Sequence, residues 1–314
     1  METSRPVPYA LGCMNFGRRT PEPEARRIVD VALERGITLF DTANAYGDGE
    51  SERILGRLLK GRRERVEIAT KVGWWKREGL SAARVRAAID ESLERLGTDR
   101  VELYYLHVPD HETPIEATLE GVADVLASGK IGRFGISNYA SWQALEVLFA
   151  CDRMGLPRPA ASQQLYNLLI RQLDLEYFRF ARKYALHTTV YNPLAGGLLT
   201  GRHLASQPND RAALAGSRFD KNALYQRRYL SDVFFQAARA FAETAAEAGL
   251  SLVTLAYAWL AQRPGVDSIL VGPGSVLHLD DALAAREVVL AAETLARVEA
   301  IHRELVGTDA SYAR

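Results

Sequence analysis

The sequence predicts an α/β barrel in which short strands and longer helices alternate along the chain. Short apolar runs typical of buried strands are separated by stretches in which apolar residues recur with helical spacing. In addition, strand after strand ends on a polar or ionisable residue. Because barrels of this class carry their chemistry at the carboxyl ends of the strands, the same pattern predicts where the active site lies.

Eight segments are expected to be strands, if the short first one is counted. Their alternation with helices favours a parallel sheet, and eight such units favour closure into a barrel. The predicted strands are residues 9–14, 37–40, 66–69, 101–106, 132–136, 160–163, 187–191 and 268–271.

Helical stretches fill the intervals between these strands. Ser81 is placed to cap the third helix, and Gly36 and Gly97 lie just past helix ends, where a left-handed residue costs least. The helix nearest the C-terminus is expected to lie outside the barrel as an extra element. The predicted helices are residues 22–35, 50–60, 82–96, 115–127, 142–151, 175–184, 233–248, 252–262 and 292–305.

One interval, residues 192–231, breaks the alternation and is rich in Gly, Asn, Arg and Pro. A loop of this length inside a compact domain is usually functional or mobile. Since it follows a strand, it is expected on the active face. No linker divides the chain, so residues 1–314 are expected to form a single domain.

The composition excludes several classes of protein. Lys plus Arg equal Asp plus Glu at 39 each, so no strong field for nucleic acid or an anionic membrane is expected. The two cysteines, Cys13 and Cys151, provide no disulfide framework. Neither a signal pattern nor an apolar run of roughly 18 residues is present. We therefore expect a soluble cytoplasmic protein without metal, nucleic-acid or membrane partners; a homodimer stays open.

Four side chains carry the strongest chemical signal: Asp41 and Tyr46 in FDTANAYG, Lys71 in IATKVG and His107 in LYYLHVPD. A tyrosine with an ordinary pKa near 10 donates a proton poorly at neutral pH, and an adjacent ammonium lowers that pKa. An aspartate can hold the ammonium, and a histidine can orient the reacting group. Each residue alone has an ordinary structural explanation, such as a cap, a surface lysine or a packed ring. Their joint placement at strand ends favours a catalytic group.

The longer motifs resemble the aldo-keto reductase family. They are FDTANAYG followed by GESERILG, then ATKVG, LYYLHVPD, GISNY, QQLYN and YNPLAGGLLTG, in family order from about residue 11 onward. LHVPDHETPIEATL, SNYASW and NPLAGGLLTG are most similar to the aflatoxin-aldehyde and succinic-semialdehyde reductase branch. The resemblance implies an (α/β)8 TIM barrel that binds a nicotinamide cofactor without a Rossmann domain. The glycine run GKIGRFG agrees, because it precedes a strand instead of opening a helix.

The resemblance also implies a role for each of the four residues. Tyr46 is the general acid that protonates a carbonyl oxygen, Lys71 lowers the pKa of Tyr46, Asp41 pairs with Lys71, and His107 places the carbonyl oxygen. The implied reaction is NAD(P)H-dependent reduction of aldehydes or ketones.

Cofactor residues carry over in the same way. Ser137, Asn138 and Gln163 match positions that bind the nicotinamide amide, and Tyr191 matches the aromatic on which the ring stacks. His278 stands where this branch has Gln or Arg, so NADP is expected and NAD is possible. The remaining implied cofactor positions are Asn192, Pro193, Leu194, Gly196, Leu198, Arg202, Arg218, Gly272, Gly274 and Ser275.

Substrate contacts are implied by further positions. Met14, Phe16, Trp74 and Trp75 fall where the family forms its pocket walls, with ordinary packing as the alternative. The other matches are Tyr225, Arg228 and the terminal Arg314, which can bind a substrate carboxylate through paired, charge-assisted hydrogen bonds. A frayed tail with a solvated arginine is the alternative for Arg314.

Three other functions were weighed. One is a specialised sugar or secondary-metabolite ketoreductase, and another is a nicotinamide-binding sensor subunit with only slow chemistry. A Schiff-base aldolase using Lys71 is disfavoured, because Asp41 would keep the ammonium charged instead of nucleophilic.

Overall fold

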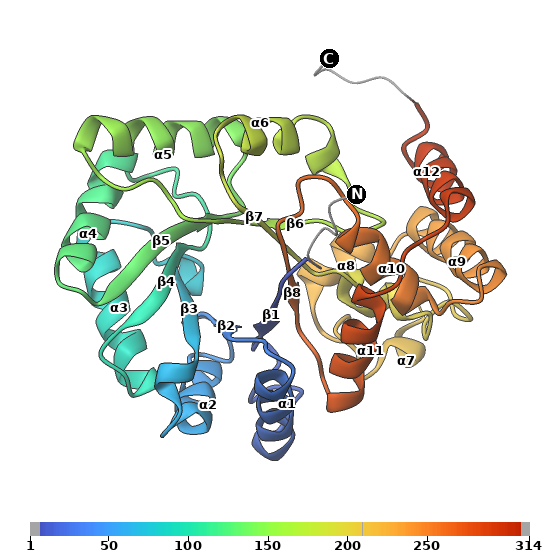
Figure 1. Ribbon diagram of the computed structural model, residues 1–314, viewed down its shortest axis with the longest axis horizontal. Helices are drawn as coiled ribbons and strands as arrows, with labels where there is room; N and C mark the ends of the chain where they lie inside the picture. Colours follow the sequence, from blue (N-terminus) through green and yellow to red (C-terminus); the bar gives the residue numbers. More distant parts are fainter. Residues whose placement is uncertain (1–6, 209, 309–314) are drawn as a thin grey trace.

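Eight parallel strands close into a barrel in chain order, with β1 pairing with β8 (Figure 1). The computed structural model describes residues 7–208 and 210–308. This confirms the predicted (α/β)8 TIM barrel. The strands are β1 (Tyr9–Gly12), β2 (Leu39–Asp41), β3 (Glu67–Val72), β4 (Val101–Leu106), β5 (Ile131–Ser137), β6 (Ser162–Leu165), β7 (Thr188–Tyr191) and β8 (Ser268–Val271).

Helices surround the barrel, with α3 to α5 on one side and α9 to α12 on the other in Figure 1. The α-helices are α1 (Glu22–Glu34), α2 (Glu50–Leu59), α3 (Ala82–Leu96), α4 (Ile115–Ala127), α5 (Ser141–Met154), α6 (Tyr177–Lys183), α7 (Arg211–Leu214), α8 (Ala223–Tyr229), α9 (Asp232–Glu247), α10 (Leu252–Ala261), α11 (Val276–Arg286) and α12 (Ala292–Val306). Short 3₁₀ segments are η1 (Arg63–Arg65), η2 (Trp75–Arg77), η3 (Gln172–Asp174) and η4 (Ala195–Thr200).

Six of the eight strands differ from their predicted bounds by one to three residues, and two of these differences bear on the site. Strand β3 continues to Val72, so Lys71 lies within the strand instead of after it. Strand β6 begins at Ser162, two residues later than expected, and includes Gln164. The glutamine is tolerated in a buried strand because its amide donates to the Tyr139 carbonyl at 2.8 Å and to the Ser162 hydroxyl at 3.0 Å.

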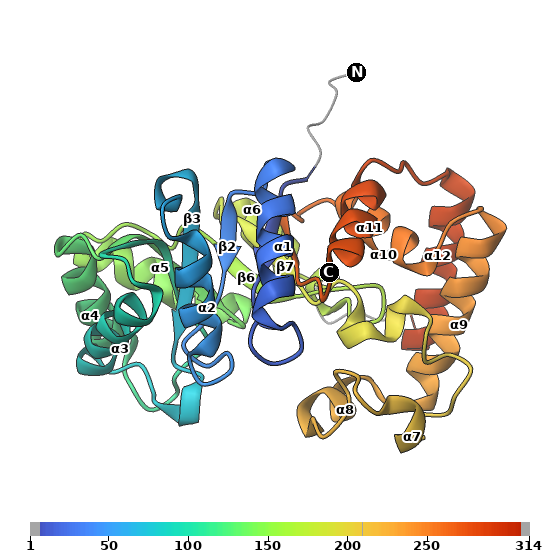
Figure 2. The ribbon, with the colours of Figure 1, turned by 90° about the horizontal axis from the view of Figure 1, so that it is seen from below.

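The interval at residues 192–231 is more ordered than expected, since it contains η4, α7 and α8. Figure 2 shows α7 and α8 at one end of the barrel, at the bottom of that view. Helix α11 was not predicted. Its first turn is capped by the Ser275 side chain, which accepts from the His278 amide, and Leu279 and Ala282 bury its inner face.

The lower barrel interior is filled by a small apolar cluster of Ala69, Leu103, Tyr105 and Ala161. Because side chains alternate along a strand, Lys71 continues the inward row that begins at Ala69. Lys71 also lies in register with Tyr105 of β4. The packed floor therefore sets Lys71 near the carboxyl ends of the strands, at the mouth of the barrel.

None of the helices in the described ranges is by itself long and apolar enough to cross a membrane. Helices α9 and α10 pass that test only as a pair, which bends by 91° at its break.

Candidate active site

Lys71 is the centre of the candidate site. Its side chain is completely buried and its ammonium forms an ion pair with the Asp41 carboxylate. The same nitrogen donates to the Thr42 carbonyl oxygen at 2.8 Å and lies 3.5 Å from the Tyr46 hydroxyl oxygen. Strand β2 supplies Asp41, β3 supplies Lys71, and the loop after β2 supplies Tyr46. The structure thus brings together three of the four predicted catalytic side chains.

Asp41 is held from two sides. One carboxylate oxygen faces Lys71, and the other accepts from the Gln163 amide at 2.8 Å. Gln163 was expected to bind a nicotinamide amide, whereas its Nε2 group is used inside the protein. Removing one partner from a buried ion pair is strongly destabilising, so this arrangement holds the lysine ammonium in place.

His107 follows β4 and completes the group. Its ring centroid lies 5.8 Å from that of Tyr46, edge to face, and 5.5 Å from that of Trp74. Its amide donates to the Val72 carbonyl at 2.8 Å, and its carbonyl accepts from Asn138 at 2.9 Å. Burial, followed by the nearby Lys71 charge, lowers the pKa of His107 well below its ordinary value. The imidazole is therefore neutral at pH 7 and offers one N–H donor.

The pKa of Tyr46 is raised overall, although the sequence predicts that Lys71 acts to lower it. Burial, with a further contribution from the Asp41 carboxylate, raises the pKa of Tyr46 well above its ordinary value. Burial also lowers the pKa of Lys71, and the Asp41 charge acts against that shift. Desolvation is stronger than the attraction between ammonium and phenolate here, so Tyr46 stays protonated at neutral pH.

The predicted nicotinamide-side residues form a connected network. The Ser137 hydroxyl donates to the Gln163 carbonyl at 2.9 Å, and the Asn138 amide donates to Ser137 Oγ at 3.1 Å. The Tyr191 hydroxyl donates to Asn138 Oδ1 at 2.7 Å. These contacts fix the partly exposed Tyr191 ring at the end of β7.

The loop after β7 is organised by Asn192. Its amide donates to the Tyr229 hydroxyl at 2.6 Å, and its Oδ1 accepts from the Gly196 amide at 2.8 Å. Pro193 and Leu198, which were expected to touch a cofactor, both have buried side chains. Of the other predicted loop positions, Leu194 is partly buried and Arg202 is exposed.

Arg218 reaches from the long loop across the barrel mouth. Its guanidinium contacts the Met14 sulfur at 3.5 Å and donates to Asn15 Oδ1 at 2.5 Å. It also lies 5.3 Å from the centroid of the Tyr225 ring. Asn15 in turn donates to the carbonyls of Gly272 at 3.2 Å and Pro273 at 3.3 Å. Asn15 was not predicted, because nothing local in the sequence marks its distant partners.

Arginines converge at this place. Burial and the nearby charges of Arg218, Arg202 and Arg18 lower the pKa of Arg19 to about 10. No carboxylate of the described residues forms an ion pair with any of the four. Unpaired, converging guanidinium groups fit an anionic ligand, as the phosphates of a dinucleotide would be. The sequence did not predict Arg19 as a phosphate-binding candidate, because it lies far from the long loop at residues 192–231.

The turn after β8 lies beside this cluster. Gly272 is exposed, and Gly274 has the His278 ring close to it. Ser275 begins α11, and its hydroxyl is used as the helix cap. The free amides at a helix N-terminus attract phosphate, so this turn also fits a dinucleotide. His278 is exposed at its edge.

The predicted substrate residues divide into two groups. Trp74 is 45% exposed and faces His107. The buried Tyr225 has the guanidinium groups of Arg218 and Arg228 near its ring. Phe16, by contrast, is completely buried in the core. Trp75 turns outward, with its indole N–H donating to Asp48 at 2.9 Å. Phe16 and Trp75 are therefore not pocket walls, and Arg314 lies outside the described residues.

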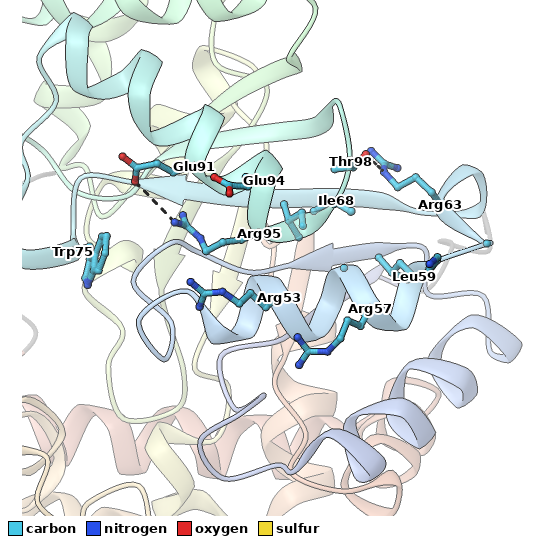
Figure 3. A pocket seen from close by; sticks show the side chains of 15 residues that line it. Arg53, Arg57, Leu59, Arg63, Ile68, Trp75, Glu91, Glu94, Arg95 and Thr98 are labelled. Atoms are coloured by element: carbon cyan, nitrogen blue, oxygen red, sulfur yellow. Dashed lines mark hydrogen bonds and ion pairs between the residues drawn. The ribbon is translucent and has the colours of Figure 1, made fainter.

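A hollow of about 860 Å³ lies elsewhere, on the outer wall between α2 and α3 (Figure 3). Two of its cationic side chains are already paired: Arg57 with Glu22 at 2.8 Å and Arg63 with Glu102 at 2.9 Å. Tyr46, Lys71 and His107 do not line it. The barrel mouth is therefore the better candidate site. Across residues 7–208 and 210–308, no cluster of three or more His, Cys, Asp or Glu side chains could hold a metal ion.

Comparison with known proteins agrees with this geometry. Residues 9–303 match the sequence profile of the Aldo/keto reductase family. The chain is 38% identical to human aflatoxin B1 aldehyde reductase member 2, over 90% of this chain and 84% of the relative. It is 35% identical to human aldo-keto reductase family 7 member A3, over 91% and 90%. A probable voltage-gated potassium channel subunit beta from Oryza sativa subsp. japonica is 29% identical over 92% and 90%. The chain belongs to the aldo/keto reductase family, whose membership implies NAD(P)H-dependent carbonyl reduction.

Proposed function

We propose that this aldo-keto reductase, a single domain over residues 1–314, reduces aldehydes or reactive ketones to alcohols with Tyr46 as proton donor. One observation carries the proposal: the Tyr46 hydroxyl lies 3.5 Å from the buried Lys71 ammonium and beside the neutral His107 ring. A protonated phenol and a neutral imidazole N–H provide two donors for one carbonyl oxygen.

Tyr46 can act as the acid although its pKa is raised. A nicotinamide cofactor held at this site would supply the hydride for the carbonyl carbon. The oxygen thereby becomes alkoxide-like, and an alkoxide is far more basic than a phenolate, so proton transfer from Tyr46 is favourable. Lys71 then stabilises the phenolate, and Asp41 keeps the ammonium charged in its buried position.

His107 supplies the second donor. Since burial keeps the imidazole neutral, it cannot take the role of a permanent cation. A neutral N–H aimed at the developing oxyanion stabilises the transition state more than the ground state. The Trp74 ring beside it shields this hydrogen bond from water on one side.

The residues on the far side of the mouth fit an NADP cofactor, and NAD is the alternative. Ser137, Asn138, Gln163 and Tyr191, which form one hydrogen-bonded network, would hold the nicotinamide end. The cluster of Arg18, Arg19, Arg202 and Arg218 and the start of α11 would hold the phosphates. These four arginines carry more positive charge than a pyrophosphate alone would require. The excess charge favours a ligand with an additional phosphate.

The human relative at 38% identity is named an aflatoxin B1 aldehyde reductase, and this name supports aldehydes as the substrate class. We further propose a cytoplasmic enzyme; a homodimer is compatible with this function. Arg228 beside Tyr225 favours aldehydes that carry a carboxylate. A specialised ketoreductase remains the enzymatic alternative, and the similarity to a probable channel subunit supports a binding protein with slow chemistry as the other.

The test is steady-state turnover of a panel of aldehydes, ketones and sugars with NADPH and NADH, followed by loss of the reduced nicotinamide. We expect rapid turnover of aldehydes with NADPH. Micromolar cofactor binding without multiple turnovers on any carbonyl would contradict the proposal and favour the binding protein. Turnover confined to one ketone or sugar would favour the specialised ketoreductase.

A further inference from the structure

Glu78 is a buried carboxylate that joins two loops at the barrel mouth. Its Oε1 accepts from the Gly73 amide at 2.8 Å and from the Asn44 side-chain amide at 2.8 Å. Its Oε2 accepts from Arg84 Nε of α3 at 2.7 Å. The side chain is only 9% exposed. One carboxylate therefore ties the loop after β2, the loop after β3 and the start of α3 together.

The two tied loops carry the two sides of the substrate entrance. Asn44 lies two residues before Tyr46, and Gly73 directly precedes Trp74. The His107 ring lies between them, 5.8 Å from the Tyr46 ring and 5.5 Å from the Trp74 ring. The contacts of Glu78 therefore set the separation of the proton donor from the facing indole.

The loop after β3 needs such a tie because its backbone is strained. Lys76 and Arg77, neither of them glycine, have φ angles of 51° and 54°. Conformations of this kind persist only when the surroundings hold them. Gly73 has φ +109°, and a side chain there would come within 2.7 Å of Leu80. The other link between the loops, from Trp75 to Asp48, is exposed to solvent, where hydrogen bonds contribute less.

We propose that Glu78 is a positioning residue that sets the width of the substrate entrance between Tyr46 and Trp74, and so discriminates carbonyl substrates by bulk. This rests on the proposed function of the site. Without the carboxylate, the Gly73 amide and the Asn44 side chain lose their acceptor, and the strained turn relaxes. The entrance then widens, which removes the close contact for small aldehydes and relieves the exclusion of large ones.

The chain offers a matched control on the same arginine. Arg84 also forms a bidentate pair with Glu91, at 2.8 and 2.7 Å. Glu91 lies on α3, where Figure 3 shows it joined to Arg95. Its hydrogen bonds and ion pairs among the described residues go to Arg84 and Arg95 and to neither loop of the entrance. Substituting Glu91 removes an Arg84 partner but leaves the loop contacts of Glu78 unchanged.

The experiment compares Glu78→Ala, Glu78→Gln and Glu91→Gln in the full chain, using propionaldehyde as the small substrate and 2-naphthaldehyde as the bulky one. We expect Glu78→Ala to raise the ratio of kcat/KM for the bulky over the small substrate about tenfold, since hydrogen bonds to a charged group are lost. The change in this ratio should result from a higher KM for propionaldehyde, while the Kd for NADPH stays unchanged. Glu78→Gln retains an acceptor for both loops and should lie near wild type, as should Glu91→Gln.

A double variant tests the route through Trp74. In a Trp74→Ala background the selectivity change caused by Glu78→Ala should vanish. If it persists, or if Glu78→Ala and Glu91→Gln behave alike, the inference is overturned. If Glu78→Ala does not fold, Glu78→Asp, which withdraws the carboxylate by one methylene, should shift the ratio in the same direction, and an unshifted ratio overturns the inference. Loss of turnover in the wild type itself would instead contradict the proposed function.

Discussion

The Lys71 ammonium nitrogen lies 3.5 Å from the Tyr46 hydroxyl oxygen and is held on its other side by the buried Asp41 carboxylate. Burial raises the pKa of Tyr46 in spite of this neighbour. We therefore propose that the lysine acts after proton transfer, by stabilising the phenolate, and not by ionising the resting phenol. Substitutions of Tyr46 and of Lys71 should therefore have different effects on activity and stability.

Replacing Tyr46 with Phe removes the acid but keeps the ring. We expect kcat to fall by roughly 10²–10⁴, the usual contribution of general acid catalysis. The Kd for NADPH should stay near wild type, because the cofactor-side residues are unchanged. Steady-state kinetics and cofactor-induced fluorescence quenching measure the two quantities. A variant that kept more than about a tenth of the wild-type kcat would show that Tyr46 is not the donor.

Replacing Lys71 with Met leaves Asp41 buried with only Gln163 as a partner. We expect the free energy of unfolding to fall by about 3–5 kcal/mol, the cost of an uncompensated buried charge. The double variant Lys71→Met with Asp41→Asn should regain part of that stability but none of the activity. Urea unfolding and kcat are the measurements. Equal stability of the single and double variants would mean that the pair is not electrostatically coupled.

The local sequence pattern was sufficient to predict the barrel fold. It was not sufficient to predict the side-chain contacts across the barrel. Asp41 and His107 could be placed because each ends or follows an apolar run whose alternation marks a strand. The hydrogen bond from Gln163 to Asp41 joins positions 122 residues apart, and that from Arg218 to Asn15 joins positions 203 apart. No local spacing encodes such pairs. They arise when the barrel closes and brings the strand ends onto one ring.

The pKa of Tyr46 illustrates the second limit. Sequence shows which charges are near one another in the chain, but not how much water is excluded around them. Desolvation outweighs the ammonium here, and its size depends on the finished packing. The same holds for Phe16, whose position in the core follows from the fold and not from its motif.

His302, on α12 outside the site, should make stability depend on pH. Burial, with the Arg171 charge, lowers its pKa to about 4. Below about pH 6.5 the His302 imidazole binds a proton in the unfolded chain but not in the folded chain. The contribution of neutral His302 to the free energy of unfolding is therefore fully present above about pH 6.5 and is lost as the pH falls toward 4. We expect His302→Gln to reduce the fall in the thermal midpoint between pH 7 and pH 5, while kcat at pH 7 stays unchanged. An identical fall in both proteins would contradict the assignment.

NADPH should bind more tightly than NADH, and His278 limits the difference. An arginine there could grip a phosphate through two hydrogen bonds, which a histidine cannot do. His278→Arg should therefore increase the ratio of the two Kd values about tenfold, measured by quenching of tryptophan fluorescence. His111→Arg adds the same charge at another exposed histidine and should leave the ratio unchanged. A rise in both variants would indicate a general charge effect.

Aldehydes that carry a carboxylate should be preferred through Arg228 and Arg314. Arg228 lies on α8 with its guanidinium 5.8 Å from the Tyr225 ring centroid, at the same ring that Arg218 contacts. We further propose, from the family resemblance, that Arg314 supplies a second guanidinium. Each charge-assisted hydrogen bond contributes roughly 1.5–3 kcal/mol, or one to two decades in kcat/KM. Succinic semialdehyde should therefore be a better substrate than butyraldehyde.

The variants that test this preference are Arg228→Met, deletion of Arg314, and Arg227→Met as the control. Arg227 is the exposed neighbour on the same helix, so its loss changes the net charge without emptying the site beside Tyr225. We expect the first two changes to raise KM for succinic semialdehyde at least tenfold and to leave 4-nitrobenzaldehyde nearly unchanged, since only the carboxylate loses a partner. Equal effects on both substrates would point to a loss of structure. If Arg227→Met raised KM for succinic semialdehyde as much as Arg228→Met does, the cause would be long-range steering by net charge. Either result would exclude a specific carboxylate site at the end of the long loop.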